Sequence, residues 1–97
     1  MALTSLLDIN LKKLIKMLEE KTGEKLPQKV VSISLSENIL HIRFTHPQTR
    51  ETDVEPLPLK TPTFLFKDEK TGEITAIEII NIDEALKELN INSSKNA

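Results

Sequence analysis

Residues 31–45 read Val-Ser-Ile-Ser-Leu-Ser-Glu-Asn-Ile-Leu-His-Ile-Arg-Phe-Thr, and this stretch decides the fold. Apolar and polar side chains alternate on both sides of Ser36-Glu37-Asn38, which is typical of strands with one buried face. The residues between the two runs have turn composition. Because parallel strands need a much longer connection, the stretch predicts an antiparallel hairpin with strands over about residues 30–35 and 39–45.

A second hairpin is predicted further along the chain, with strands over about residues 63–67 and 73–80. Its turn is Asp68-Glu-Lys-Thr-Gly72, where the glycine suits a backbone conformation with positive φ. Between the two hairpins, residues 46–62 hold four of the five prolines. Proline removes backbone donors, so this segment is predicted to be a loop or a sheet edge, with a short strand near residues 49–54 left open.

The strand over residues 73–80 is apolar on both sides, which is unusual for a half-buried strand. One face carries Ile77 and Ile79, and the other carries Ile74, Ala76 and Ile80. A strand of this kind is usually covered on both faces. We therefore expect the N-terminal helix over one face, and a second copy, a partner chain or the C-terminal segment over the other. Ile77 and Ile79 are the predicted interaction face.

Two helices are predicted around the hairpins. A stripe at helical spacing predicts the first over about residues 5–22, and it consists of Leu7, Leu11, Leu14, Ile15 and Leu18. Ser5 and Asp8 resemble a capping pair, although Asp8 can itself be the cap, and Gly23 supplies the left-handed residue that ends many helices. Asp83 is the predicted cap of a short helix over about residues 84–89, and residues 91–97 are predicted to be a frayed tail.

These elements predict one α+β domain over residues 1–97, in which the N-terminal helix packs on a four-stranded, mainly antiparallel sheet of two hairpins. The chain has 97 residues and no cysteine, which excludes disulfides, zinc–thiolate sites and thiol catalysis. The start lacks the basic segment of a secretory signal. The longest apolar-leaning stretch without a charge, Val30 to Ser36, is far too short to cross a bilayer. We therefore expect a cytoplasmic protein that does not bind membranes.

Charge is unevenly divided between the two halves of the chain. Residues 1–50 carry eight basic and five acidic side chains, whereas residues 51–97 carry five basic and ten acidic ones. Lys12, Lys13 and Lys16 lie away from the apolar stripe, as a solvated helix face or as a patch that binds phosphate or a partner. The basic excess is small and the chain has no tyrosine or tryptophan for base stacking, which argues against nucleic-acid binding.

The chain offers few groups for chemistry. His41 and His46 are its only histidines, they would point to opposite faces of a straight strand, and no cysteine can complete a zinc site. We predict no metal, no cofactor and no catalytic residue. Glu78 is the one candidate functional carboxylate, because it stands among isoleucines. It either pairs with a base such as Arg43 or acts as a general acid or base with a raised pKa.

Three segments resemble one known family: Glu37 to Phe44, Asp53 to Glu55, and Phe64 to Ile80. Over roughly residues 37–86 the chain is similar to the family called domain of unknown function 2283. The matching residues are Leu40, Ile42, Arg43, Asp68, Gly72, Ile77, Glu78 and Ile79. His41 stands where that family has tyrosine, and Ala76 where it has glycine. The resemblance implies a protein-partner role, because some members look like antitoxin partners of small ribonuclease-like toxins.

The predicted function is a small interaction protein without enzymatic activity. It would bind itself, as a homodimer, or a small protein partner. The first alternative is a small enzyme that uses Glu78 with His41 or Arg43 in a sheet-lined cleft. The second is a nucleic-acid-associated protein that uses Lys12, Lys13 and Lys16.

Overall fold

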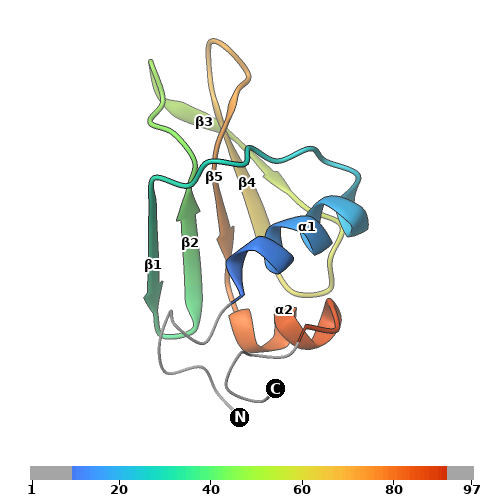
Figure 1. Cartoon of the computed structure of the whole chain (residues 1–97). Coiled ribbons are helices and arrows are strands. Elements are labelled where there is room, and N and C mark those ends of the chain that lie inside the picture. Colours follow the sequence, from blue (N-terminus) through green and yellow to red (C-terminus); the bar gives the residue numbers. More distant parts are fainter. Residues whose placement is uncertain (1–9, 92–97) are drawn as a thin grey trace.

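The computed structural model describes residues 10–91, apart from the side chains of residues 52–54. In this part of the chain, one helix precedes five strands and a second helix follows them (Figure 1). The elements are α1 (Leu11–Thr22), β1 (Ser32–Ser36), β2 (Ile39–Arg43), β3 (Glu51–Pro56), β4 (Thr63–Asp68), β5 (Ile74–Ile79) and α2 (Ile82–Glu88). The fold is therefore α+β, with an N-terminal helix and a short C-terminal helix.

The strands form one antiparallel sheet in the order β1-β2-β5-β4-β3. Both predicted hairpins are confirmed, as β1 with β2 and as β4 with β5. The predicted number of four strands is wrong, because the proline-rich segment supplies β3 as a fifth. Pro56 is the last residue of β3, and β3 lies at an edge of the sheet. At that place proline removes no donor from the interior of the sheet.

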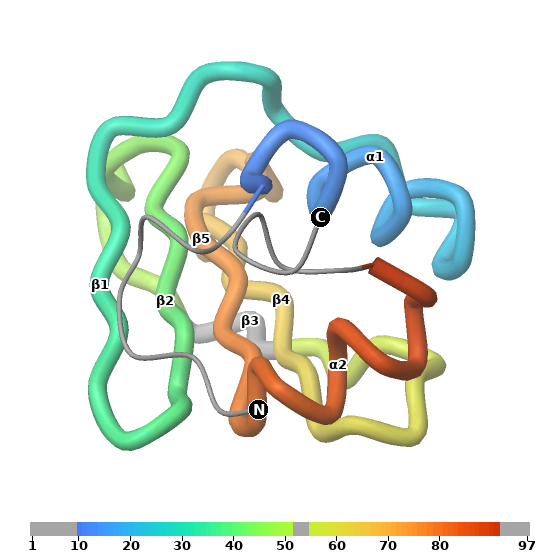
Figure 2. Tube along the Cα trace, turned by 60° about the horizontal axis from the view of Figure 1, so that its bottom comes forward, coloured from blue at the N-terminus to red at the C-terminus, as the bar shows by residue number. Residues whose placement is uncertain are grey.

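Both helices lie on the same face of the sheet, as Figures 1 and 2 show together. α1 crosses over β5 and β4, and α2 follows directly from the end of β5. Large apolar side chains that are less than 2% exposed fill the layer between helices and sheet: Leu14, Leu18, Leu40, Ile42, Leu65, Ile77, Ile79, Ile82 and Leu89. Burial of each such side chain contributes roughly 1.5–3 kcal/mol to folding. This layer is the hydrophobic core of the protein.

Asparagines cap both helices. The side chain of Asn10 accepts a hydrogen bond from the backbone N–H of Lys13 at 3.2 Å, so α1 begins at Leu11. Ser5 and Asp8, with the rest of the predicted helix before Asn10, lie outside the described residues. Asn81 caps α2 in the same way, which corrects the predicted cap at Asp83 and moves the helix from 84–89 to Ile82–Glu88.

Asp83 instead lies in the first turn of α2, where a carboxylate is favoured by the helix dipole. Of the predicted tail, Ile91 is buried and packs in the core. Residues 92–97 lie outside the described residues.

The two hairpin turns are built differently. Glu37 and Asn38 connect β1 to β2 and both have positive φ, at 51° and 69°, which is the geometry of a two-residue type I′ turn. The β4–β5 turn is organised by the carboxylate of Asp68. This buried side chain accepts hydrogen bonds from the backbone N–H groups of Lys70 and Thr71, and Gly72 completes the turn with φ of 74°.

Candidate functional site

Ile77 and Ile79 do not form a surface. Both are fully buried beneath the helices, with exposed fractions of 0%, and they belong to the core of this chain. The prediction of an interaction face at these residues is therefore wrong. The alternation of β5 correctly places them together on one face, and that face is the one that α1 and α2 cover.

The opposite face of the sheet has no helix over it within the described residues (Figure 1). We call it the open face. The cross-strand rows on it are His41–Glu78–Phe64 and Arg43–Ala76–Phe66. Ala76 is fully buried here although no layer covers it, because the larger Arg43 and Phe66 flank it on both sides. A small residue between two large ones needs no second layer.

Glu78 pairs with His41 on the open face. The His41 Nδ1 and Glu78 Oε2 atoms are 3.3 Å apart, and the two side chains are 27% and 33% exposed. The His41 ring also meets the ring of Phe66 edge-on, with centroids 6.0 Å apart. The expected pairing of Glu78 with Arg43 is not observed. Instead the structure joins Glu78 and His41 from two neighbouring strands on the open face, where both side chains are partly exposed.

Arg43 is engaged with a different carboxylate, Glu51 on β3. The Arg43 Nη1 and Glu51 Oε1 atoms are 2.6 Å apart, and the Thr75 hydroxyl donates to the same carboxylate. The hydrogen bond from Arg43 lowers the pKa of Glu51 below its usual range, because it outweighs the opposing effect of burial. The Arg43–Glu51 ion pair thus connects β2 with the edge strand β3.

Two further carboxylates are held by backbone amides and have structural roles. Burial alone would raise the pKa of Asp68, but hydrogen bonds from Lys70, Thr71, Gln48 and Thr49 outweigh burial and lower the pKa. Glu88 at the end of α2 likewise accepts hydrogen bonds from the N–H groups of Lys60 and Thr61, which lower its pKa against the effect of burial. Asp68 thus fixes loops to the end of β4, and Glu88 fixes the loop before β4 to α2.

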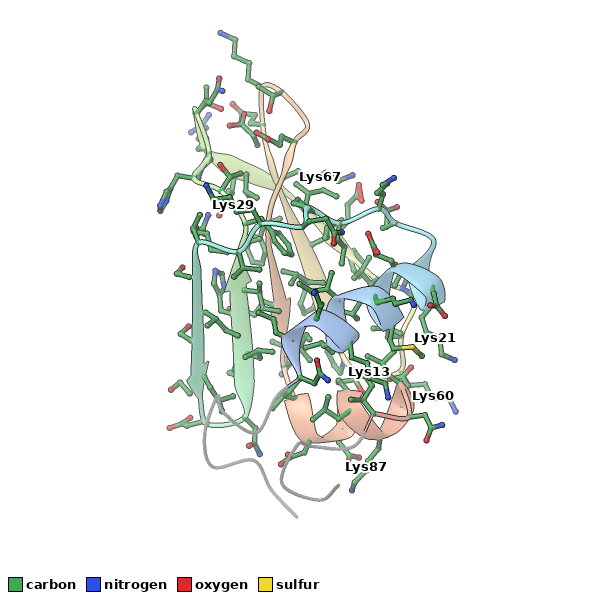
Figure 3. The ribbon with its side chains drawn as sticks, in the orientation of Figure 1. Lys13, Lys21, Lys29, Lys60, Lys67 and Lys87 are labelled. Atoms are coloured by element: carbon green, nitrogen blue, oxygen red, sulfur yellow. The ribbon has the colours of Figure 1, made fainter. Side chains whose placement is uncertain are left out.

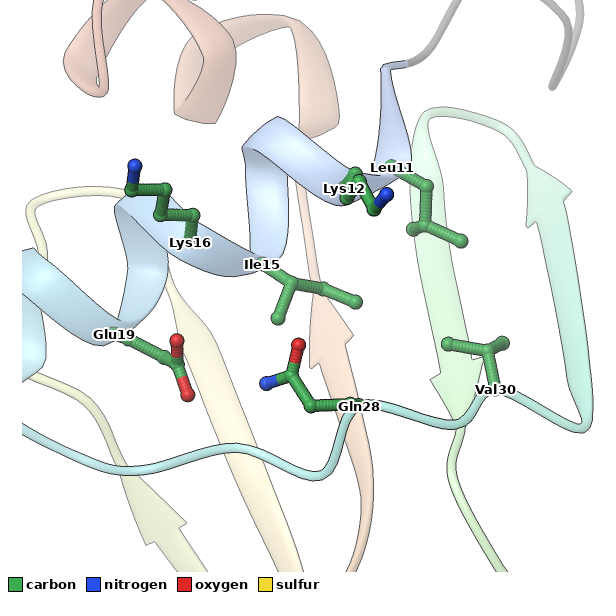
Figure 4. Close-up of a pocket in the computed structure, with 7 residues that line it drawn as sticks. All are labelled: Leu11, Lys12, Ile15, Lys16, Glu19, Gln28 and Val30. Carbon is green, nitrogen blue, oxygen red and sulfur yellow. The ribbon is translucent and has the colours of Figure 1, made fainter.

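Lys12, Lys13 and Lys16 are exposed on α1 and line a shallow hollow together with Asn10, Met17 and Glu20. A larger groove of about 600 Å³ lies between α1 and the segment that leads to β1 (Figure 4). Its lining residues are Leu11, Lys12, Ile15, Lys16, Glu19, Gln28 and Val30.

One polar side chain of this groove joins the segment to the helix, and another is bonded within the segment. Glu19 accepts a hydrogen bond from the N–H of Leu26 at 2.8 Å, and Gln28 donates one to the carbonyl of the same residue at 3.1 Å. Glu19 and Gln28 are thus engaged within the chain. Lys12 and Lys16 leave a positive rim along the helix.

The two edges of the sheet differ sharply. β1 carries no charged residue, its serines are exposed, and Val31 just before it is 45% exposed. β3, at the other edge, has a register irregularity between Glu51 and Asp53 and ends in proline. Charges, bulges and prolines are the devices by which proteins keep an edge from pairing with another strand. β3 has all three, and β1 has none.

No group of three or more His, Asp or Glu side chains in the described part of the chain is placed to hold a metal ion. His46 is exposed after β2, apart from the His41–Glu78 pair. Neither helix within residues 10–91 has the length and apolar character needed to span a bilayer.

Comparison of this chain with protein-family models, with curated proteins and with solved structures found no match. The resemblance to the domain of unknown function 2283 family stays a prediction. Functional inference therefore depends on the geometry described above.

The sequence contains a signal for the β1 edge that involves no chemically reactive group. Val30 to Ser36 is a run without a charge. If this run forms a strand with a neighbour on one side only, it is an edge strand with no charge or proline to block pairing with another strand. That condition depends on the strand order, which the hairpins alone do not give.

Proposed function

We propose that this chain is a non-enzymatic interaction domain that binds protein by strand addition at β1. The observation that carries the proposal is the contrast between the two edges of the sheet, since β1 alone lacks every device that blocks pairing. In strand addition, backbone hydrogen bonds supply affinity and side-chain pockets supply specificity. The resemblance to antitoxin-like proteins is consistent with such a role, with a second copy or a small protein as the partner.

Apolar side chains along the edge support the same proposal. Val31 is exposed, and Ile33 and Leu35 are only half-buried although they face the core side of the sheet. An added strand would extend the sheet and remove these side chains from water, which contributes about 25 cal/mol for each Å² of apolar area.

The two alternatives have weaker support. An enzyme would use the His41–Glu78 pair, but both side chains are partly exposed on the open face, where water has access to them. A nucleic-acid role would use Lys12, Lys13 and Lys16, which form one small basic patch on a chain of net charge −2.

The test is affinity capture from an extract of the source organism with three tagged chains: wild type, Ser34→Lys and Gln48→Lys. A lysine at position 34 places a charge in the middle of the free edge, whereas the same change at the exposed residue Gln48 lies away from it. Wild type and Gln48→Lys should retain a protein in stoichiometric amount that Ser34→Lys loses. Equal recovery with all three chains, or no stoichiometric protein with wild type, would overturn the proposal.

Thermal unfolding of the three chains provides the control. Ser34 and Gln48 are both exposed, so neither substitution should change the free energy of unfolding by more than about 0.5 kcal/mol. A loss of capture can then be assigned to the edge rather than to the fold.

A further inference from the structure

The hairpin geometry shows which backbone groups of β1 face away from the sheet. Ser36 and Ile39 flank a two-residue turn, so they exchange hydrogen bonds with each other. Along an antiparallel pair, residues direct their N–H and C=O groups alternately toward the neighbour and away from it. Ser34 and Ser32 therefore point theirs to β2, and Ile33 and Leu35 point theirs outward at the free edge.

We infer that the occupant of this edge is β1 of a second copy of the chain, antiparallel and centred on Ser34. This inference rests on the proposed function, because it names the partner of the same edge. A two-fold axis at Ser34 places Ile33 opposite the partner's Leu35, and Leu35 opposite the partner's Ile33. In each of these pairs, the outward N–H and C=O groups of the two residues hydrogen-bond to each other. This one register therefore satisfies the outward groups of Ile33 and Leu35 in both copies.

The side chains fit this register. On the open face only serines meet: Ser34 lies opposite the partner's Ser34, and Ser32 opposite the partner's Ser36. On the covered face, the half-buried Ile33 and Leu35 meet their counterparts and continue the apolar layer across the junction. No like charges face each other along β1, because the strand carries none. Figure 1 shows β1 as the outermost strand on its side of the sheet.

Charges at the two ends of β1 favour the same pairing. Lys29 is exposed before β1, and Figure 3 shows it at the end of the strand that is opposite to the turn. Glu37, in that turn, is also exposed. The antiparallel pairing brings Lys29 near the partner's Glu37 at both ends of the junction, so the two opposite charges meet twice. One strand pair is a small interface, so we expect dissociation in about the micromolar range.

The experiment uses cysteines, because the chain has none of its own. Ser34→Cys places two thiols on the two-fold axis at a position without backbone hydrogen bonds across the junction. There the Cα atoms of opposite residues are about 4.5 Å apart, within the range of a disulfide. In oxidised glutathione, this full-length variant should form a covalent dimer. Gln48→Cys, which is exposed and away from the edge, is the matched control.

Two more variants test the register. Ser32→Cys and Ser36→Cys should each dimerise slowly alone, but their mixture should form a heterodimer, because Ser32 lies opposite the partner's Ser36. If Ser34→Cys dimerises no faster than Gln48→Cys, the inference is overturned. If Ser32→Cys alone is fastest, the proposed register is overturned. Neither result decides the proposed function, which fails only on the two outcomes given for the capture experiment.

Solution mass provides an independent measurement without cysteines. The dissociation constant of the wild-type chain should rise about fivefold to tenfold in Lys29→Glu, because attraction becomes repulsion at both ends of the junction. The double variant Lys29→Glu/Glu37→Lys should restore it, because each pair is then reversed and again opposite in sign. A wild-type chain that stays monomeric up to millimolar concentration would overturn the inference.

Discussion

The two faces of the sheet are made of neighbouring residues in the same strands, yet within residues 10–91 only one face has a layer over it. On the covered face, Ile77 and Ile79 meet Leu40 and Ile42 of β2 beneath the helices. On the open face, Ala76 and Glu78 of the same strand meet Arg43 and His41. An apolar residue on a sheet face without a second layer can therefore be buried by the larger side chains next to it in the same sheet. Ala76 is as inaccessible as Ile77, but large neighbours in its own sheet cover it.

The largest expected effect separates the two faces directly. Ile77→Ala should lower the free energy of unfolding by about 3 kcal/mol, because it leaves a cavity in a layer that two helices close. Ile80→Ala, which shortens a half-buried side chain just after β5, should cost about 1 kcal/mol or less. Urea denaturation of both variants measures this contrast. Equal losses would mean that the two faces are equally packed.

Acid should weaken the protein through its structural carboxylates. Asp68 and Glu51 have pKa values below the ordinary 3.8 and 4.5 in the folded chain, so the unfolded chain takes up protons first as the pH falls. Their contribution is fully present above about pH 5 and is lost progressively below the ordinary values. The urea midpoint should therefore fall between pH 5 and pH 3.

The matched variants for this acid effect are Asp68→Asn and Glu51→Gln. Each should be less stable than wild type at pH 7 and should show a shallower dependence of the urea midpoint on pH. Wild type and Asp68→Asn with parallel pH curves would contradict the role given to Asp68.

The smallest expected effect lies at the open-face pair. Glu78→Gln removes the charge beside His41, and both side chains are partly exposed, so the free energy of unfolding should change by about 0.5 kcal/mol or less. Thermal denaturation of wild type and Glu78→Gln checks this. A loss as large as that of Ile77→Ala would show that the open face is a second core.

The hairpins and helices follow from the sequence because their periods are local properties. Alternation around Glu37-Asn38 specifies both strands and the turn, and the leucine stripe specifies α1. The cap of α2 was misplaced because Asn81 and Asp83 are equally good caps, and packing of Ile82 decides between them. The prolines of residues 46–62 exclude a central strand but permit an edge, so the sequence alone does not decide whether β3 forms.

The predicted interaction face at Ile77 and Ile79 is wrong for a different reason. Alternation shows that Ile77 and Ile79 share a face, but it does not show which face the helices cover. That choice depends on the connection from β5 into α2 and on the position of β5 between β2 and β4. The unprotected edge at β1 also depends on strand order. Both features are properties of the whole sheet and have no local pattern.

The central place of β5 also governs the order in which the chain can fold. The β1–β2 hairpin is local and can form within microseconds, but β2 gains its second neighbour only when Arg43 and Leu40 pair with Ala76 and Ile79, far along the chain. During synthesis, the first hairpin therefore emerges with both of its edges unpaired. β2 can pair with β5 only after the last quarter of the chain has been made. The C-terminal strand, and not the N-terminal helix, sets the moment at which this domain becomes one structure.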